Sequence, residues 1–328
     1  MIVTEQLTKI YRTYRKEPGL WGAVKGLGSR KYDETRAADG VSFKIEEGEF
    51  VGFLGPNGAG KTTVLKMLSG LLNPTSGKAT VLGFTPWERK DEMKRQFALL
   101  MGQKNALWWD LPARESMELN RAIYGIDRKK FEQIVGGMSE LLDVTDKLNV
   151  MVRELSLGER MKCELTAALL HRPKVLFLDE PTIGLDVDMQ VTVREFIKAY
   201  NERFGATVLL TSHYMADVLA LCPRIIVIDK GRPLFDGALQ ELVHSVRPEK
   251  RIILKLSKPV DRADAEAIGD VVEHDPGRLV LQVRPDRVLQ AIGGAMARLP
   301  VADLVVEDPP LEDVLRDLFE RSRVEARA

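Results

Sequence analysis

The sequence lacks the features that mark secreted or membrane-spanning chains. Its 328 residues include only two cysteines, Cys163 and Cys222, which lie far apart. No disulfide framework is therefore expected, and a reducing compartment is indicated. No apolar run approaches the roughly 18 residues that a membrane-spanning helix needs. The amino terminus has no basic flank followed by an apolar core, so we expect no signal peptide and a cytoplasmic protein.

The chain also lacks a net charge and visible internal repeats. Its 48 lysines and arginines equal its 48 aspartates and glutamates, so no global positive field indicates a nucleic-acid partner, and we expect none. Positive charge is in excess only locally, in a glycine-rich insertion at residues 12–36. A solvated loop and a contact with anionic lipid headgroups both remain open for it. Part of it has the spacing of a short helix with an apolar side, made by Leu20, Trp21, Val24 and Leu27.

The spacing of apolar residues predicts an α/β fold. Residues 1–11 and 40–45 read as strands, and we expect the first to be an edge strand. From about residue 91 to 170 the apolar positions recur three and four apart, which predicts a mostly helical subdomain. Apolar strands then alternate with helices, which indicates a parallel sheet covered by helices. These strands are predicted at residues 175–178, 207–211 and 224–228.

A smaller α/β domain is predicted in the last part of the chain, where charged, alternating strands and helices follow each other. The strands are expected at residues 251–256 and 279–283, and the helices at 261–268 and 286–298. We therefore predict two domains, residues 1–240 and residues 241–328, which is the number that the chain length favours.

The segment Gly55–Thr62, Gly-Pro-Asn-Gly-Ala-Gly-Lys-Thr, lies between an apolar strand at residues 50–54 and a helix. A glycine-rich turn in this setting lets backbone N–H groups converge on a phosphate at the helix N-terminus. Lys61 then reaches the β- and γ-phosphates, and the Thr62 hydroxyl binds Mg²⁺. A turn without a ligand is the alternative, but the complete motif with correct flanks argues against it. We predict a nucleoside triphosphate held by Gly55, Pro56, Asn57, Gly58, Ala59, Gly60, Lys61, Thr62 and Thr63.

An apolar strand that ends in two acids, residues 174–181, carries the second candidate site. Asp179 at its end is placed to hold Mg²⁺, and Glu180 to act as general base or to orient water. The alternative is a buried strand that ends in solvated acids. Upstream, Ser156 and Gly158 begin a helix and form a second candidate anion site. Simple capping is the alternative there, because Ser156 followed by Glu159 fits a capping box.

These motifs, in this order, resemble the ATP-binding cassette (ABC) family of ATPases over roughly residues 1–240. The resemblance implies a P-loop NTPase cassette with a parallel core sheet, an N-terminal antiparallel β portion and a helical subdomain, followed here by the small C-terminal α/β domain. It implies ATP and Mg²⁺ as cofactors. It also implies that Tyr11 stacks on adenine, that Gln103 contacts Mg²⁺ and the attacking water, and that His213 contacts the γ-phosphate. Asp186, in the loop Gly184-Leu-Asp186, is added to the nucleotide site.

The family signature is altered in this chain. The usual sequence is Leu-Ser-Gly-Gly-Gln, whereas residues 155–159 read Leu-Ser-Leu-Gly-Glu. Ser156 and Gly158, which in the family contact the γ-phosphate of the opposite subunit, are kept. Leu157 stands in place of a glycine, so its side chain should point away from the nucleotide. Glu159 brings a charge near phosphate, and we expect a competent site, with the effect of these two residues on its rate left open.

The resemblance also implies partners and a location. A phosphate loop and a signature in one chain imply a homodimer with two composite ATP sites, bound to separate permease subunits on the cytoplasmic face of the cell membrane. Residues 103–112 are where family members receive the permease, and Trp108 and Trp109 are either exposed anchors for it or core packing. The finer likeness, including residues 308–314, is to drug- and polymer-exporter subunits. An importer subunit with a regulatory C-terminal domain is the alternative. A soluble ABC ATPase of translation or DNA, or a non-hydrolysing sensor, fits less well.

Overall fold

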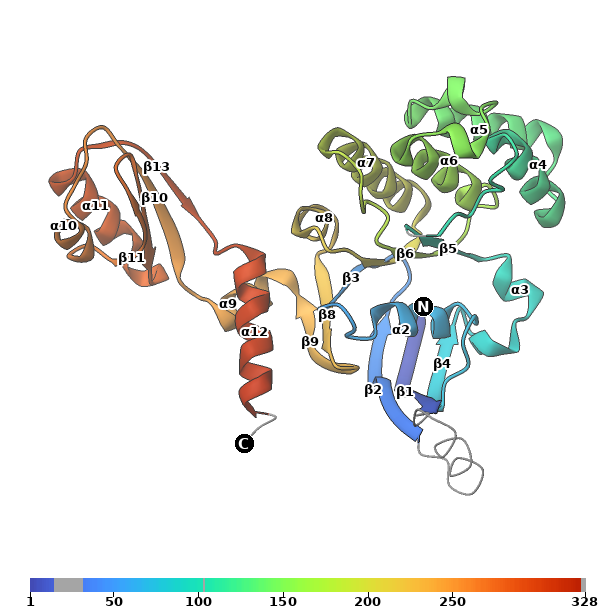
Figure 1. Ribbon diagram of the computed structural model, residues 1–328, viewed down its shortest axis with the longest axis horizontal. Helices are drawn as coiled ribbons and strands as arrows, with labels where there is room; N and C mark the ends of the chain where they lie inside the picture. Colours follow the sequence, from blue (N-terminus) through green and yellow to red (C-terminus); the bar gives the residue numbers. More distant parts are fainter. Residues whose placement is uncertain (15–31, 103, 326–328) are drawn as a thin grey trace, which may run out of the picture. The chain divides into compact units, whose positions relative to one another are not determined.

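The computed structural model describes residues 1–14, 32–102 and 104–325 (Figure 1). The chain divides into two compact units, Met1–Asp236 and Gly237–Ala328. Gln103 and the short helix expected around Leu20 and Trp21 lie outside the described residues. Within the described ranges, none of the helices has the length and apolar character needed to cross a membrane.

The first unit begins with a three-stranded antiparallel sheet of order β2-β1-β4. Its strands are β1 (Ile2–Tyr14), β2 (Tyr32–Ile45) and β4 (Ser76–Val81). The prediction of an edge strand at residues 1–11 is wrong, because Ile2 pairs with both Ile45 and Val81 and β1 is the central strand. The buried side chains of Ile2 and Leu7 fit this central position.

A six-stranded sheet of order β5-β6-β7-β3-β8-β9 forms the core of the first unit. Five neighbouring strands, β5 to β8 in this order, run parallel, and β3, β6 and β7 are buried along their whole length. Burial on both faces explains why these strands read as continuous apolar runs. The strands are β3 (Phe50–Leu54), β5 (Phe97–Met101), β6 (Val175–Asp179), β7 (Thr207–Thr211), β8 (Arg224–Asp229) and β9 (Arg232–Ala238).

Helices lie beside the two sheets of this unit (Figure 1). The helices that follow the core strands are α2 (Lys61–Leu68), α7 (Val187–Phe204) and α8 (Met215–Leu221). Residues 91–170 are mostly helical, as expected, in α3 (Asp91–Lys94), α4 (Ala113–Tyr124), α5 (Arg128–Leu141) and α6 (Leu157–Leu169). The same stretch also contains strand β5, which the helical spacing did not indicate. Short 3-10 helices are η1 (Pro86–Glu88), η2 (Thr145–Lys147) and η3 (Val152–Glu154).

The second unit is a four-stranded antiparallel sheet of order β11-β12-β10-β13 with helices. Ile252 and Leu254 of β10 and Leu281 of β12 form its core with Ala291 and Ala295 of α11. Strands β10 and β12 were predicted, whereas β11 and β13 were not. The elements are α9 (Leu239–Val246), β10 (Lys250–Leu256), α10 (Arg262–Glu266), β11 (Asp270–Asp275), β12 (Arg278–Val283), η4 (Pro285–Arg287), α11 (Val288–Arg298), β13 (Val301–Glu307) and α12 (Leu311–Glu325).

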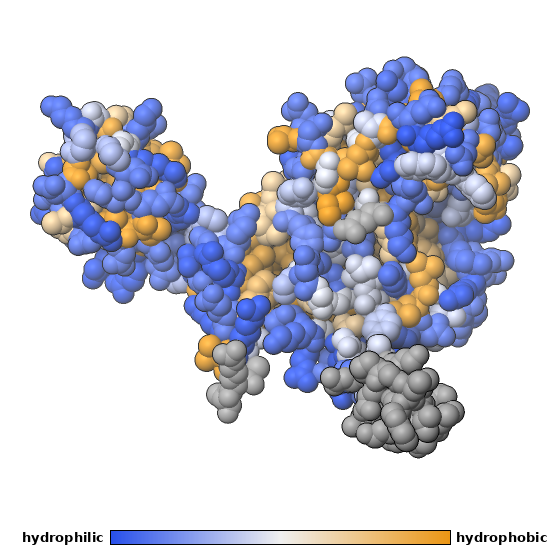
Figure 2. Space-filling model, viewed as in Figure 1, coloured by the Kyte–Doolittle hydropathy of each residue, from blue (hydrophilic) through white to orange (hydrophobic). Residues whose placement is uncertain are grey.

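Hydrophilic residues cover most of the surface seen in Figure 2, with hydrophobic residues in separate patches between them.

The two cysteines are buried, and neither forms a disulfide. Burial raises the pKa of the Cys163 thiol to about 12, so this thiol is inert toward disulfide exchange at neutral pH.

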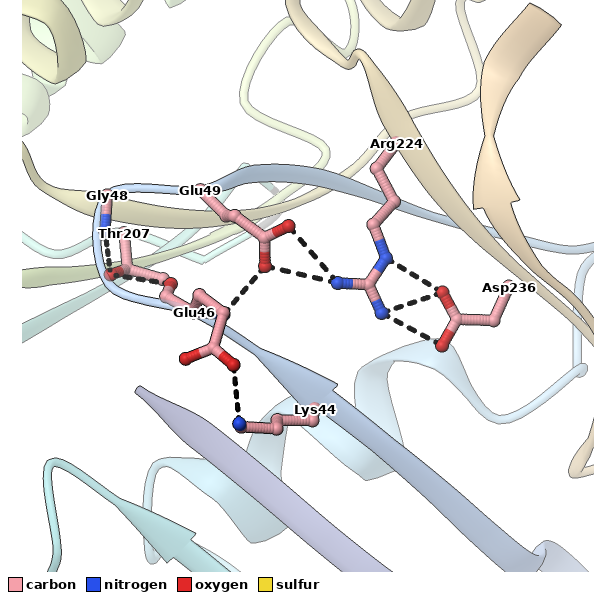
Figure 3. Close-up of polar contacts among 7 residues, drawn as sticks. All are labelled: Lys44, Glu46, Gly48, Glu49, Thr207, Arg224 and Asp236. Carbon is pink, nitrogen blue, oxygen red and sulfur yellow. Dashed lines mark hydrogen bonds and ion pairs between the residues drawn. The ribbon is translucent and has the colours of Figure 1, made fainter. Parts of the chain in front are cut away.

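A closed polar network occupies the edge of the core sheet where its parallel strands begin (Figure 3). The Arg224 guanidinium donates to both carboxylate oxygens of Glu49, at 3.2 and 3.1 Å, and to both of Asp236, at 2.8 and 3.0 Å. The Thr207 hydroxyl accepts the Gly48 N–H at 2.9 Å. These groups connect neighbouring strands at the end of the sheet where the parallel strands begin. The loops that carry the candidate functional residues lie at the opposite end, where the parallel strands finish.

Candidate nucleotide-binding and catalytic site

The predicted motifs lie at the carboxyl ends of three adjacent core strands. Strands β6, β7 and β3 are neighbours in the sheet, and each continues into a loop that carries candidate residues. The phosphate loop follows β3, Glu180 follows β6, and His213 follows β7. In open parallel sheets ligands bind at this edge, so the topology brings together residues that are far apart in sequence.

The backbone of the phosphate loop requires its glycines. Gly58 and Gly60 have positive φ angles, 80° and 105°, in the region that favours glycine. A Cβ at Gly60 would lie 1.9 Å from the Ala37 carbonyl oxygen, and one at Gly55 would lie 2.3 Å from the Ile228 carbonyl oxygen. No side chain fits at either position. The loop therefore keeps a tight turn before α2, as a phosphate cradle does.

Lys61, the first residue of α2, is buried within this turn. Its ammonium donates to the carbonyl oxygens of Gly55 at 2.6 Å and Pro56 at 3.1 Å. Burial lowers the pKa of Lys61, while the charges of Glu180 and Asp179 oppose that shift. The ammonium is thus held inside the loop, facing the acids at the end of β6.

Asp179 and Thr62 form a group of oxygen ligands beside the loop. The Thr62 hydroxyl donates to Asp179 Oδ2 at 2.9 Å, and the Thr211 hydroxyl donates to Asp179 Oδ1 at 2.7 Å. A hydroxyl and a carboxylate at this distance fit Mg²⁺, which usually takes one or two carboxylates and completes its shell with phosphate and water. Among the described residues, no group of three or more aspartates, glutamates, histidines and cysteines is arranged to hold a metal ion.

Glu180 and His213 meet at the same edge. His213 Nε2 lies 2.7 Å from Glu180 Oε1. Glu180 has a φ of 55°, a left-handed conformation that is uncommon for residues other than glycine and that recurs at active sites. Its N–H donates to the carbonyl oxygen and hydroxyl of Thr211, at 3.0 and 3.1 Å.

Two residues that sequence reasoning missed support this arrangement. Thr211 contacts both acids, and the only sequence signal for it is its place two residues before His213. Gly102 donates its N–H to the Asp179 carbonyl at 2.9 Å, and a Cβ there would lie 2.2 Å from the Glu180 carbonyl oxygen. The sequence signal that could have indicated Gly102 is that it is a glycine placed directly before Gln103.

The altered signature begins helix α6. Ser156 Oγ accepts the Glu159 N–H at 3.3 Å, and Glu159 Oε2 accepts the Ser156 N–H at 2.9 Å, so the capping box is formed. Lys147 Nζ lies 3.1 Å from Glu159 Oε1. The hydrogen bonds from Ser156 and then from Lys147 lower the pKa of Glu159. A Cβ built at Gly184 would lie 2.8 Å from Leu157 Cδ2, so the Leu157 side chain lies against the loop after β6.

Comparison with known proteins identifies the family. The ABC transporter family description matches residues 38–183. The ABC transporter ATP-binding protein NatA of Bacillus subtilis (strain 168) is 36% identical over 236 residues, 71% of this chain and 96% of that protein. The chain belongs to the ABC transporter family. It is an ATPase of this family, and the expected ATP-binding cassette is confirmed.

Further matches extend the likeness of this ABC ATPase along the chain. The daunorubicin resistance ATP-binding protein DrrA3 of Streptomyces coeruleorubidus is 31% identical over 295 residues, 88% of this chain and 93% of that protein. Residues 248–307 match the EvrA-like ABC transporter, C-terminal domain. A solved dimeric ATP-binding cassette, in a post-hydrolysis state with ADP and Pi, has a TM-score of 0.61 at 23% identity and covers 73% of this chain and 99% of that chain. This last match supports the predicted cassette fold.

Two other predicted residues of the ABC ATPase have defined surroundings. Tyr11 on β1 is 39% exposed, and Lys9 Nζ lies over its ring, 5.6 Å from the centroid, a cation–π distance. Asp186 is the N-cap of α7, where its side chain accepts the Met189 N–H at 2.8 Å. Gln103, as noted, lies outside the described residues.

The loop after Gln103 presents aromatic residues at the surface. Trp108 and Trp109 are 59% and 46% exposed, so the core-packing alternative for them is wrong. The Arg160 guanidinium lies 5.9 Å from the ring centroid of Trp109, a cation–π distance. Arg160 belongs to α6, directly after the signature, and Glu164 of the same helix accepts the Ala106 N–H at 3.3 Å. The exposed loop and the signature helix are therefore in direct contact.

Proposed function

We propose that this chain is the ATP-hydrolysing subunit of an ABC exporter, working as a homodimer on separate permease subunits at the cytoplasmic face of the cell membrane. The observation that carries the proposal is the 2.7 Å contact between Glu180 and His213 beside Asp179 and the phosphate loop. Relatives named for drug resistance and for Nod factor export favour export. Residues 1–240 are the motor, and residues 241–328 are an accessory domain that stabilises the dimer.

The residues of one chain divide the work at the phosphate end of ATP. The glycine-rich turn and Lys61 hold the β- and γ-phosphates, because backbone N–H groups and an ammonium converge there. Thr62 and Asp179, with Gln103, would hold Mg²⁺, which would supply charge neutralisation for the phosphates. Glu180 orients the attacking water and takes its proton, while the His213 ring, beside Glu180, contacts the γ-phosphate.

The second half of each site comes from another copy of the chain. The first N–H groups of a helix have no partner within the helix, and they attract anions. Ser156 and Gly158 at the start of α6 therefore suit the γ-phosphate of ATP bound to the partner subunit. The charge of Glu159 is compensated by Lys147 and by the Ser156 N–H, which reduces its repulsion of phosphate. Nucleotide thus holds two chains together, and loss of the γ-phosphate releases them.

A solution mass measurement tests the dimer. The Glu180→Gln variant should bind ATP with Mg²⁺ but should not hydrolyse the ATP. The mass in solution should therefore rise from the 36.8 kDa of one chain to the mass of two chains. The matched control is Lys61→Ala in the same background, which should stay monomeric because phosphate binding is lost. A monomer at high protein concentration, with ATP demonstrably bound, would contradict the proposal.

The permease contact is proposed for the loop that carries Trp108 and Trp109. Exposed aromatic residues are typical anchors at protein interfaces. Purification of the tagged chain from membranes should retain a membrane protein with spanning helices, and Trp108→Ala with Trp109→Ala should lose it. Retention of the same protein by the double variant would refute this surface.

A further inference from the structure

Asp217 is a buried carboxylate with hydrogen bonds to three separate segments of the first unit. It lies in the first turn of α8, and its side chain is 1% exposed. Oδ2 accepts the hydroxyl of Ser212 at 2.7 Å and that of Thr182 at 2.5 Å. Oδ1 accepts from Arg194 Nη1 at 2.9 Å.

The two hydroxyls come from the two loops that carry the proposed catalytic residues. Thr182 is two residues after Glu180, and Ser212 is the residue directly before His213. Both donate to the same oxygen atom, so neither loop can move away from the other without breaking a buried hydrogen bond to a charged group. Such a bond is costly to lose, because the polar group that remains is buried without a partner.

Arg194 offsets the cost of keeping the charged Asp217 carboxylate buried. It is on α7, the helix that Asp186 caps, and its side chain is 15% exposed. An opposite charge and two hydroxyl donors together satisfy both oxygens, which is the condition for keeping a buried charge. A carboxylate that served only to stabilise the start of α8 could use the Ser212 hydroxyl of the loop that enters this helix, but it would not need the Thr182 hydroxyl from the loop after β6.

We propose that Asp217 is a positioning residue for ATP hydrolysis, which sets the Glu180–His213 contact by binding Thr182 and Ser212 at one carboxylate oxygen. This inference rests on the proposed roles of Glu180 and His213. It assigns to Asp217 no contact with ATP, so its loss should change the rate of the chemical step and leave nucleotide affinity nearly intact.

The test uses the full chain and measures kcat, KM for ATP, nucleotide binding and thermal unfolding. Asp217→Asn should lower kcat about tenfold or more while the Kd for ATP changes less than about twofold, as expected for a group that acts on the transition state through others. Thr182→Val and Ser212→Ala should each lower kcat as well, and Thr182→Ser, which keeps the hydroxyl, should restore it. These variants carry the test if Asp217→Asn does not fold. The matched control is Asp236→Asn, an arginine-paired acid at the opposite edge of the sheet (Figure 3), which should leave kcat unchanged.

A double-mutant comparison separates positioning from general stability. If Asp217 acts through His213, then Asp217→Asn should cost little further activity in a His213→Ala background. Equal losses in both backgrounds, or a lower unfolding temperature with unchanged kcat, would overturn the inference. Failure of the proposed function gives a different result: Glu180→Gln and His213→Ala would then leave the ATPase rate at the wild-type value.

Discussion

Glu164 should make the stability of this protein fall as pH rises. It is on α6, its side chain is 1% exposed, and it accepts the Ala106 N–H at 3.3 Å with Arg160 Nε at 3.6 Å. Burial raises its pKa from the ordinary 4.5 to about 7, and the hydrogen bond and Arg160 only partly oppose this. The folded state therefore binds a proton between these values that the unfolded state has released.

The sign and the size of this pH dependence follow from the difference between the ordinary and the folded-state pKa of Glu164. A raised pKa contributes stability that is complete below the unfolded value and is lost as pH rises through about 7. Glu164→Gln removes this dependence, so the free energy of unfolding of the variant should increase relative to that of the wild type as pH rises. Between pH 5.5 and 8.5 the gain should grow by about 2 kcal/mol, because linkage leaves about 1 kcal/mol of penalty at the lower pH and about 3 at the higher.

Urea denaturation followed by tryptophan fluorescence at these two pH values measures the difference. Glu159→Gln is the matched control on the same helix, because the pKa of Glu159 is lowered and its contribution has the opposite sign. That variant should lose stability relative to the wild type at neutral pH, and the loss should shrink as pH falls toward the folded pKa. An equal free-energy gap between Glu164→Gln and wild type at both pH values would refute the reasoning.

Three further predictions concern the site and the loop. Gly60→Ala should abolish ATP binding, measured by calorimetry, because its Cβ would lie 1.9 Å from a carbonyl oxygen; undiminished affinity would contradict this. Thr211→Val removes the hydroxyl that binds Asp179 and should lower kcat about tenfold in an ATPase assay, whereas a wild-type rate would show that this bond is dispensable. Trp109→Ala should reduce the membrane protein that co-purifies with the chain, and Leu289→Ala, another exposed apolar residue, should not; equal effects would remove the proposed contact.

The phosphate loop was predictable because its signal is local. The glycines, the lysine and the flanking strand and helix are contiguous, and the positive φ angles of Gly58 and Gly60 are what that spacing requires. The parallel core was also visible, since strands buried on both faces read as apolar runs. The contact between Glu180 and His213 joins residues far apart in sequence, and only the resemblance to the ABC family linked them.

The features that could not be predicted from the sequence depend on contacts between distant segments. The central place of β1 requires pairing with β4, which comes after two other strands in the chain, and a single segment cannot reveal how many neighbours it will have. Strand β5 was hidden inside a stretch of helical spacing, and β11 and β13 are largely exposed strands with weak alternation. Asp217 gave no signal either, because an acid in the first turn of a helix is ordinary until its partners are known.

The altered signature is compensated by contacts within the same chain. A carboxylate at Glu159 would by itself repel phosphate, but one of its oxygens accepts the Ser156 N–H and the other faces Lys147. The same bonds stabilise the start of α6, because an acid in the first turn and a capping box both satisfy the helix end. Leu157 lies against Gly184, so the bulk that replaces a glycine is taken up within the chain. The residues that depart from the family pattern are thus fixed by contacts within the chain, while the Ser156 hydroxyl and the first N–H groups of α6 lie at the helix end.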